Sequence, residues 1–437
     1  MDFNLTWQTG MTIAVVALGV VASIPDRRRL AALWAFFLPI DFVTAVPVGL
    51  LDAIRYAGAA ALGLLWPATL PDERRRRLHR LGLMLILLGG VRLIAATAHH
   101  DPNGTQFALV LLAATAVAYL MAIRPAIHSH LIGGFMAGMT LSVVTALMQA
   151  MHWPALRAGN NEGHRYPGLS TYTMLFTWQV VLGLIVLGYL VTAGAKRRSP
   201  QWWLAAALIP LYLLALLTNG AQGGLLGLGS AALALAWGRR RDLTASKLGI
   251  TLVATGAALA AIALVVLATN INVPTVSGFR EGNYRNETAR LEVASNGWNE
   301  FLNHPLTGMS RSAFISEYRI APHFLPIDSA ATAGVVGLVL SVGILGLLAA
   351  EVVRGPGDGG AWAQAGHLGV VVMAANTLTD AYGPFVGIAR STPLWIALVI
   401  ASGYRHREDD PPAPDSTLLI ESDAVSRAEP LEGSSDR

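Results

Sequence analysis

Residues 74–97 read RRRRLHRLGLMLILLGGVRLIAAT, a cluster of arginines followed by an apolar run near 80–97. The run is long enough to cross a bilayer, and the same pairing of basic cluster and apolar run recurs along the chain. Only 13% of the 437 residues are charged, whereas soluble domains carry about 25%. Runs of this length are too uniformly apolar for barrel strands. The sequence therefore predicts an all-α polytopic membrane protein.

The basic clusters predict the topology, because short loops rich in Lys and Arg stay in the cytoplasm. The number of apolar runs between successive clusters is even, as one common side requires. With a retained N-terminal helix the total is about 13 transmembrane helices, and 12 remains open. The clusters placed in the cytoplasm are 27–29, 74–77, 196–198, 239–241, and Arg405 with Arg407. The expected spans lie near 9–25, 30–47, 51–69, 80–97, 106–123, 131–151, 168–193, 202–218, 221–237, 248–269, 327–351, 363–380 and 388–403.

Polar segments divide the chain into four parts. Residues 1–269 and 327–404 are expected to hold the N-terminal and C-terminal transmembrane helices. Residues 270–326 form one long, partly helical extracytoplasmic loop, in which apolar residues recur at helical spacing until His304-Pro305 ends the helix. The polar, acid-rich residues 405–437 predict a disordered cytoplasmic tail.

Composition also excludes several kinds of site. The chain has no cysteine, which excludes disulfides, thiolate catalysis and Cys-ligated metal. Its net charge of +4 lies in short clusters between apolar runs, so it does not indicate a nucleic-acid partner. The sequence His99-His100-Asp101 is a weak metal candidate, because adjacent residues of a short loop rarely converge on one ion without further ligands. We therefore expect no metal and no cofactor.

The outer loops are unusually cationic, against the tendency of positive charge to stay inside. Ion pairs with neighbouring glutamates could account for each arginine alone, but the set favours an anionic ligand, since guanidinium groups bind phosphate oxygens in pairs. The candidate ligand is the diphosphate of a polyprenyl-linked sugar. The arginines are Arg280, Arg285, Arg290, Arg311 and Arg319 in the long loop, with Arg157 and Arg165 in the loop near 152–167.

His323 is the candidate catalytic base. A lone loop histidine is more often a surface residue, but this one lies just before an expected span and close to the cationic loop. Asp328 follows it and could orient the ring. The pKa of imidazole suits it to accept a proton from a sugar hydroxyl near neutral pH.

Three stretches, in this order, carry a resemblance to a known family. They are GNNEGHRYPGLSTYTMLF (159–176), LLTNGAQGGLLGLGSAALAL (216–235), and RLEVASNGWNEFLNHPLTGMSRSAF (290–314) followed by PHFLPIDSAATAGVVGLVL (322–340). Together they resemble the O-antigen ligase and O-antigen polymerase superfamily, which are membrane glycosyltransferases of the GT-C type.

The resemblance implies roles for particular residues. His323 stands at the family's catalytic histidine, Arg290 at an arginine of the outer loop and Arg165 at the arginine before the medium-loop helix. Gln222 replaces the family's hairpin arginine, and Phe324 replaces the Asn that usually follows the histidine. The expected catalytic residues are thus His323 and Arg290, and the expected substrate-binding residues are Arg165, Gln222, Arg285, Arg311 and Arg319.

These observations favour a metal-independent, inverting glycosyltransferase on the outer face of the bacterial inner membrane. It would transfer or polymerise a glycan from a polyprenyl-diphosphate-linked donor to a glycan or glycolipid acceptor. The expected partners are this donor, this acceptor and the surrounding membrane lipids. The rival hypotheses are a transporter or flippase of lipid-linked glycans and a non-catalytic scaffold. A transporter would explain charges near or within spans, although two of them, Arg55 and Arg92, could equally be buried structural pairs or diphosphate ligands. These charged residues are Asp41, Arg55, Arg92, Asp380 and Arg390.

Overall fold

The chain divides into two units, 1–404 and 405–437, and the second lies outside the described residues. The computed structural model describes residues 27–40, 48–151, 166–170, 173–219, 222–238, 283–357, 360–378, 380 and 382–404. The side chains at 27, 48–54, 222, 236–238 and 283–289 are outside this description.

The described part of the chain is helical and contains no strand. Six of its helices are long and apolar enough to cross a membrane, and two more apolar helices, within α9 and α16, are shorter. The predicted class of an all-α polytopic membrane protein is therefore confirmed, while the expected spans near 9–25 and 248–269 lie outside the described residues. The six are α4 (Asp72–Ala98), α5 (Pro102–Ala122), η1 with α6 (Pro125–Ile127, His128–Ala150), α7 with η3 (Thr173–Tyr189, Leu190–Gly194), α8 (Pro200–Asn219) and α14 (Leu325–Arg354). The remaining helices are α2 (Arg27–Phe36), α3 (Val48–Leu65), α9 (Gln222–Gly238), α12 (Asn283–Asn303), α13 (Arg311–Tyr318), α15 (Gly360–Asn376) and α16 (Ile388–Ala401).

The prediction of a membrane span near 30–47 is wrong, because helix α2 ends at Phe36, inside that range. Helix α2 has only 10 residues, about 15 Å of helix, which is half the thickness of the hydrocarbon core. The chain turns after Phe36, and the buried Arg55 of α3 donates from Nη2 to the carbonyls of Phe37 and Ile40 at 2.8 Å each. Of the two roles left open for Arg55, the structure shows the structural one, since the guanidinium caps carbonyls beyond the end of α2.

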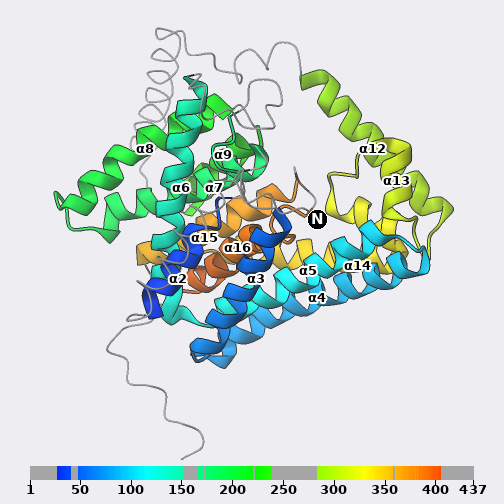
Figure 1. Cartoon of the computed structure of the whole chain (residues 1–437), viewed down its shortest axis with the longest axis horizontal. Helices are drawn as coiled ribbons and strands as arrows, with labels where there is room; N and C mark the ends of the chain where they lie inside the picture. The colour runs from blue at the N-terminus through cyan, green and yellow to red at the C-terminus, as the bar shows by residue number, and fades with distance from the viewer. Residues whose placement is uncertain are drawn as a thin grey trace, which may run out of the picture. The chain divides into compact units, whose positions relative to one another are not determined.

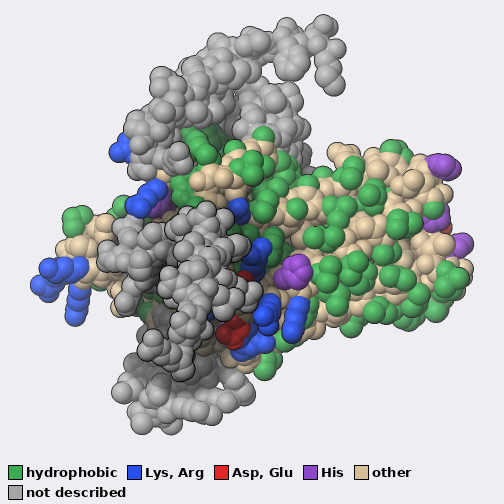
Figure 2. All heavy atoms as spheres, turned by 90° about the horizontal axis from the view of Figure 1, so that it is seen from below, with side chains coloured by type: hydrophobic (Ala, Val, Ile, Leu, Met, Phe, Trp, Pro, Cys, Tyr) green, Lys and Arg blue, Asp and Glu red, His purple; other side chains and the backbone are tan. Residues whose placement is uncertain are grey.

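Helices α4, α5 and α14 pack side by side (Figure 1). The two helices α4 and α5 form an antiparallel hairpin, joined by the short turn at 99–101. Helix α14 packs on α4, and α16 packs on α5. Many large apolar side chains of α4 and α14 stay exposed, among them Leu83, Ile86 and Val339. Figure 2 shows a face on which hydrophobic side chains predominate, as expected for helices that meet lipid rather than water.

Helix α14 is broken at Gly334, whose φ of 64° and ψ of −157° are not helical. The turn after α12 fills the break: Val335 N donates to Pro305 O at 2.8 Å, and Met309 N donates to Ala331 O at 2.6 Å. A Cβ on Gly334 would lie 2.3 Å from Leu306 O, so this approach requires glycine. The turn thus satisfies backbone groups that a broken membrane helix would otherwise leave unpaired.

The loop at 270–326 is partly helical, as predicted, and its described part contains α12 and one further helix, α13, that the sequence analysis did not predict. Helix α12 ends at Asn303, directly before His304-Pro305. It packs on the first turns of α14, where a Cβ on Gly297 would lie 2.8 Å from Cγ2 of Ile327. The short helix α13 is tied to α12 by Tyr318, whose hydroxyl donates to Glu300 at 2.9 Å.

Candidate active site

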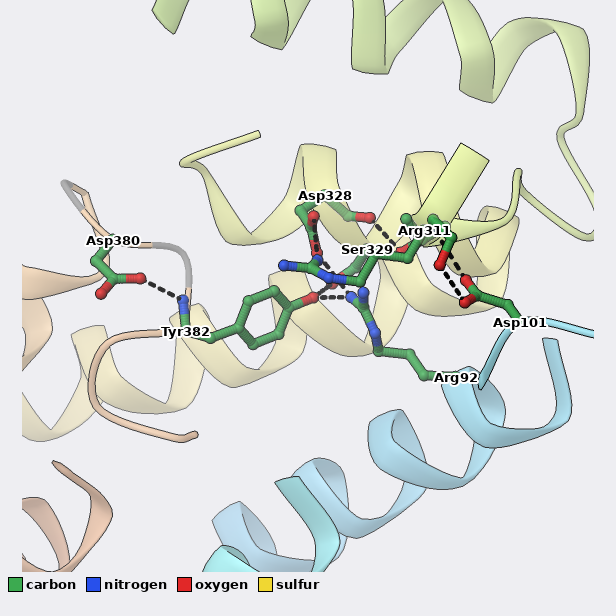
Figure 3. Close-up of polar contacts among 9 residues, drawn as sticks. Arg92, Asp101, Arg311, Asp328, Ser329, Asp380 and Tyr382 are labelled. Carbon is green, nitrogen blue, oxygen red and sulfur yellow. Dashed lines mark hydrogen bonds and ion pairs between the residues drawn. The ribbon is translucent and has the colours of Figure 1, made fainter. Parts of the chain in front are cut away.

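The centre of the site is a buried carboxylate in the first turn of α14. Asp328 is 0% exposed, and each of its oxygens meets a different arginine. Nη1 of Arg92, from α4, lies 2.8 Å from Oδ2, and Nη1 of Arg311, from α13, lies 2.9 Å from Oδ1 (Figure 3). Two guanidinium groups share one carboxylate, so the triad carries a net positive charge.

Aromatic side chains complete this cluster. The hydroxyl of Tyr382, in the turn between α15 and α16, accepts a hydrogen bond from Arg92 and lies 2.9 Å from Oγ of Ser329 (Figure 3). The Phe107 ring packs edge-on against Tyr382 and lies 4.3 Å from the Arg311 guanidinium and 5.0 Å from that of Arg92. Cation–π contacts and hydrogen bonds therefore fix both arginines in place.

Asp101 anchors the helix that carries Arg311. It accepts from the backbone N–H of Gly104 at 2.9 Å, which caps α5, and from Oγ of Ser310 and the backbone N of Ser312 at 2.9 Å each. Burial raises the pKa of Asp101, but the hydrogen bonds from Ser312, Gly104 and Ser310 outweigh it and lower the pKa to about 2. One carboxylate thus joins the starts of α5 and α13 and sets the position of Arg311 between Ser310 and Ser312.

We expect Asp101→Ala to loosen α13. Loss of a helix cap alone costs about 0.5–2 kcal/mol, and here donors at the starts of two helices lose their acceptor. Thermal unfolding of the purified protein in detergent should show a lower midpoint than the wild type. Glu292→Ala, on the exposed side of α12, is the control and should leave the midpoint unchanged. An unchanged midpoint in Asp101→Ala would show that α13 is held by its other contacts.

The structure gives no support to a metal at the turn between α4 and α5, since Asp101 is committed to the two helix starts. Within the described ranges, no group of three or more His, Cys, Asp or Glu side chains could hold an ion.

His323 lies between α13 and α14 and is half-buried. Burial lowers its pKa below the usual value, and the positive charge of Arg290, on α12, lowers it further. The carboxylates of Asp380 and Asp328 act in the opposite direction but are outweighed. The lowered pKa favours the neutral imidazole, which is the form that can accept a proton.

The prediction that Asp328 orients the ring of His323 is wrong. Both oxygens of that carboxylate are held by Arg92 and Arg311, and no hydrogen bond joins the His323 ring to Asp328. Asp328 acts on His323 through its charge alone. It orients the two arginines instead.

The predicted site residues divide into three groups. Arg290 lies near enough to His323 for its charge to lower the pKa of the imidazole, and Arg311 belongs to the triad with Asp328. Arg319 is exposed at the C-cap of α13 with a φ of 70°, and it forms no ion pair with the described residues. The description does not extend to the side chains of Arg165, Gln222 and Arg285, of which Gln222 begins α9 and Arg285 lies in α12.

Sequence reasoning missed the partners of Arg92. It noted an arginine within an apolar span and left its role open, and the structure shows a buried ion pair with Asp328. A charge inside a membrane helix needs a partner, so the sequence could have been searched for a carboxylate near another span that pairs with Arg92. Asp380 and Arg390 likewise pair, with Nη1 3.1 Å from Oδ2. They flank the turn that carries Tyr382.

The fold and the site together define a class, namely a polytopic membrane protein with a cationic, histidine-containing site beside a two-helix loop. Residues 204–342 match the family described as O-antigen ligase. This match confirms the resemblance, and over these residues the chain carries an O-antigen ligase family domain. Such a domain indicates a membrane enzyme that transfers glycans. The matched range includes Arg290, Arg311 and His323, whereas Arg92 and Tyr382 lie outside it. No curated protein sequence matches the chain.

Proposed function

We propose that the chain is a metal-independent, inverting glycosyltransferase that uses a polyprenyl-diphosphate-linked glycan as donor. The observation that carries the proposal is the position of the half-buried His323 beside α12, where a Cβ on Gly297 would lie 2.9 Å from Cγ of Pro322. From α12 the charge of Arg290 lowers the pKa of His323, and Arg290 forms no ion pair with the described residues. A neutral imidazole is the base that such a transfer needs, and a guanidinium group suits the departing diphosphate. The family match covers both residues.

In the proposed reaction the acceptor is a glycan or glycolipid hydroxyl. A ring nitrogen of His323 takes the hydroxyl proton while the oxygen forms a bond to the anomeric carbon. The bond from that carbon to the diphosphate oxygen breaks on the opposite side, so the configuration inverts. The leaving diphosphate keeps the electron pair, and Arg290 stabilises the charge that develops on it. Arg165, Gln222, Arg285 and Arg319 are proposed as further diphosphate contacts.

The flippase remains the second candidate, but one observation used in its favour has another explanation. Arg92 lies within a membrane span, and the structure shows it held by Asp328 and Tyr382. A charge that is held in place by fixed partners suits a rigid scaffold better than a residue that moves with cargo. A reconstituted assay with a lipid-diphosphate donor separates the two, since only the enzyme releases free lipid diphosphate.

The Arg290 variants test the proposal in that assay. Arg290→Ala should lower the transfer rate on the order of 10²-fold, the typical cost of one charge-stabilising donor. Arg290→Lys keeps the charge but loses the planar fork, so it should fall between wild type and alanine. Arg354→Ala, at the far end of α14, is the matched control and should retain activity.

The pH profile provides a second readout. Because the charge of Arg290 lowers the pKa of His323, Arg290→Ala should move the acidic limb of kcat/KM to higher pH, and Arg290→Lys should not. If the rate falls in Arg290→Ala but the limb stays in place, His323 is not the titrating base.

We also propose that the site faces the periplasm from the inner membrane, and the absence of cysteine makes this testable. His304→Cys lies in the turn after α12, and Arg197→Cys lies in an expected cytoplasmic cluster, where both positions are exposed. A membrane-impermeant maleimide should label His304→Cys in intact spheroplasts but Arg197→Cys only after permeabilisation. The reverse pattern would place the site in the cytoplasm and contradict the proposed function.

A further inference from the structure

Helix α12 has two apolar faces. One contains the buried Val293, Gly297 and Phe301 and packs against its neighbours. The other contains Leu291 and Trp298, which are 74% and 43% exposed, and Leu302, which is 59% exposed. Positions separated by seven and four residues fall on one stripe of a helix. The stripe borders the packed face, since the ring centroids of Trp298 and Phe301 lie 5.2 Å apart. We call these three residues the outer stripe.

The outer stripe continues into the exposed apolar surface of α14. One turn beyond Leu302 stands Leu306, which is 77% exposed. Its carbonyl sits in the break of α14, 2.3 Å from where a Cβ on Gly334 would be. The next exposed side chains along α14 are Val335, Val336 and Val339, which belong to a helix long and apolar enough to cross a membrane. Apolar surface therefore runs from the lipid-facing side of α14 through Leu306 to α12.

We propose that α12 lies in the boundary region of the lipid bilayer, with the outer stripe in contact with lipid. Continuity with the surface of α14 selects lipid over a soluble partner, and a tryptophan within the stripe fits this depth, where indole rings gather. Among the described residues of α12, those exposed beside the stripe include no cation; they are Glu292, Ser295, Asn299 and Asn303. Along this part of the helix the contact is therefore apolar and does not depend on anionic lipid headgroups.

This contact does not depend on the proposed function, although it bears on it. Arg290 and His323 lie on the packed side of α12, so a helix seated on lipid would hold them at the level where a lipid-linked diphosphate emerges. A lipid donor could then reach Arg290 without leaving the bilayer.

Site-directed spin labelling tests the proposal on the full chain, which has no native cysteine. Leu291→Cys, Trp298→Cys and Leu302→Cys would each carry one nitroxide, with Glu292→Cys, Asn299→Cys and Asn303→Cys as controls on the same helix. The protein would be reconstituted in phosphatidylcholine vesicles. Collisions with oxygen, which concentrates in lipid, would be compared with collisions with a water-soluble nickel chelate.

We expect the ratio of oxygen to nickel collisions to be several times higher at the stripe positions than at the controls, and to be unchanged when anionic lipid is added. Equal ratios at stripe and control positions would place α12 in water and overturn the proposal. Low collision rates with both reagents at the stripe would show that protein covers it, such as a second copy of the chain, and would overturn it equally. Because three stripe positions are tested, failure of Trp298→Cys to fold leaves two that decide the matter.

Discussion

Replacement of His323 by alanine is expected to abolish glycan transfer while leaving the fold intact. General base catalysis contributes about 10²- to 10⁴-fold, so transfer should fall more than about a hundredfold on that scale. The ring makes no hydrogen bond with the described residues, and it is only half-buried, so its loss removes little packing. The rate would be measured with a defined lipid-diphosphate donor at equal protein level.

Two further variants make the result specific. His323→Gln should be nearly as inactive as alanine, because an amide can orient a hydroxyl but cannot take its proton. His304→Ala is the matched control, since this histidine is exposed in the turn after α12 and should retain most activity. Donor binding should persist in His323→Ala, because the arginines remain. Equal rates in wild type and His323→Ala would remove the residue from the mechanism and favour the flippase.

The wild-type pH profile follows from the same group. The base works only when neutral, and its pKa is lowered by burial and by Arg290. Activity should therefore stay high as the pH falls to the unperturbed imidazole value of about 6.5, and it should decline only below that.

Local sequence signals predicted much of the fold. Apolar runs locate α4, α5 and α14 because the bilayer imposes one length on every spanning helix. The end of α12 followed from His304-Pro305, a local steric effect. The short α2 was missed, because its end depends on Arg55, a residue of another helix. The break at Gly334 was missed because glycine is also common in continuous membrane helices.

The site was only partly predictable. His323, Arg290 and Arg311 were named as candidates because they stand in a polar segment where arginine and histidine need explaining, and their roles stay predictions. The pairing of Arg92 with Asp328 joins residues 236 apart, and the contact of Arg92 with Tyr382 spans 290. Such contacts depend on how α4, α14 and the turn after α15 pack together, which no local pattern in the sequence records.

Asp328→Ala is expected to be the most destabilising single change in the site. It leaves Arg92, which is 4% exposed, beside Arg311 with no carboxylate between them. Removing one partner of a buried ion pair costs about 3–5 kcal/mol, because the remaining charge is left buried and unpaired. Thermal unfolding in detergent should show a large fall in the midpoint, with less folded protein recovered from membranes.

Two comparisons separate this effect from a simple loss of contacts. Asp380→Ala breaks the ion pair between Asp380 and Arg390. Both side chains are partly exposed, so screening by solvent limits the loss of folding stability to about 1 kcal/mol. Equal midpoints for Asp328→Ala and Asp380→Ala would mean that leaving Arg92 without a carboxylate costs no more than breaking a partly exposed ion pair.

The double variant Arg92→Met with Asp328→Asn removes both charges of the buried pair, and such replacements are often neutral. It should therefore recover the part of the lost stability that comes from the stranded guanidinium of Arg92, while Arg311, which is 19% exposed, still lacks its partner.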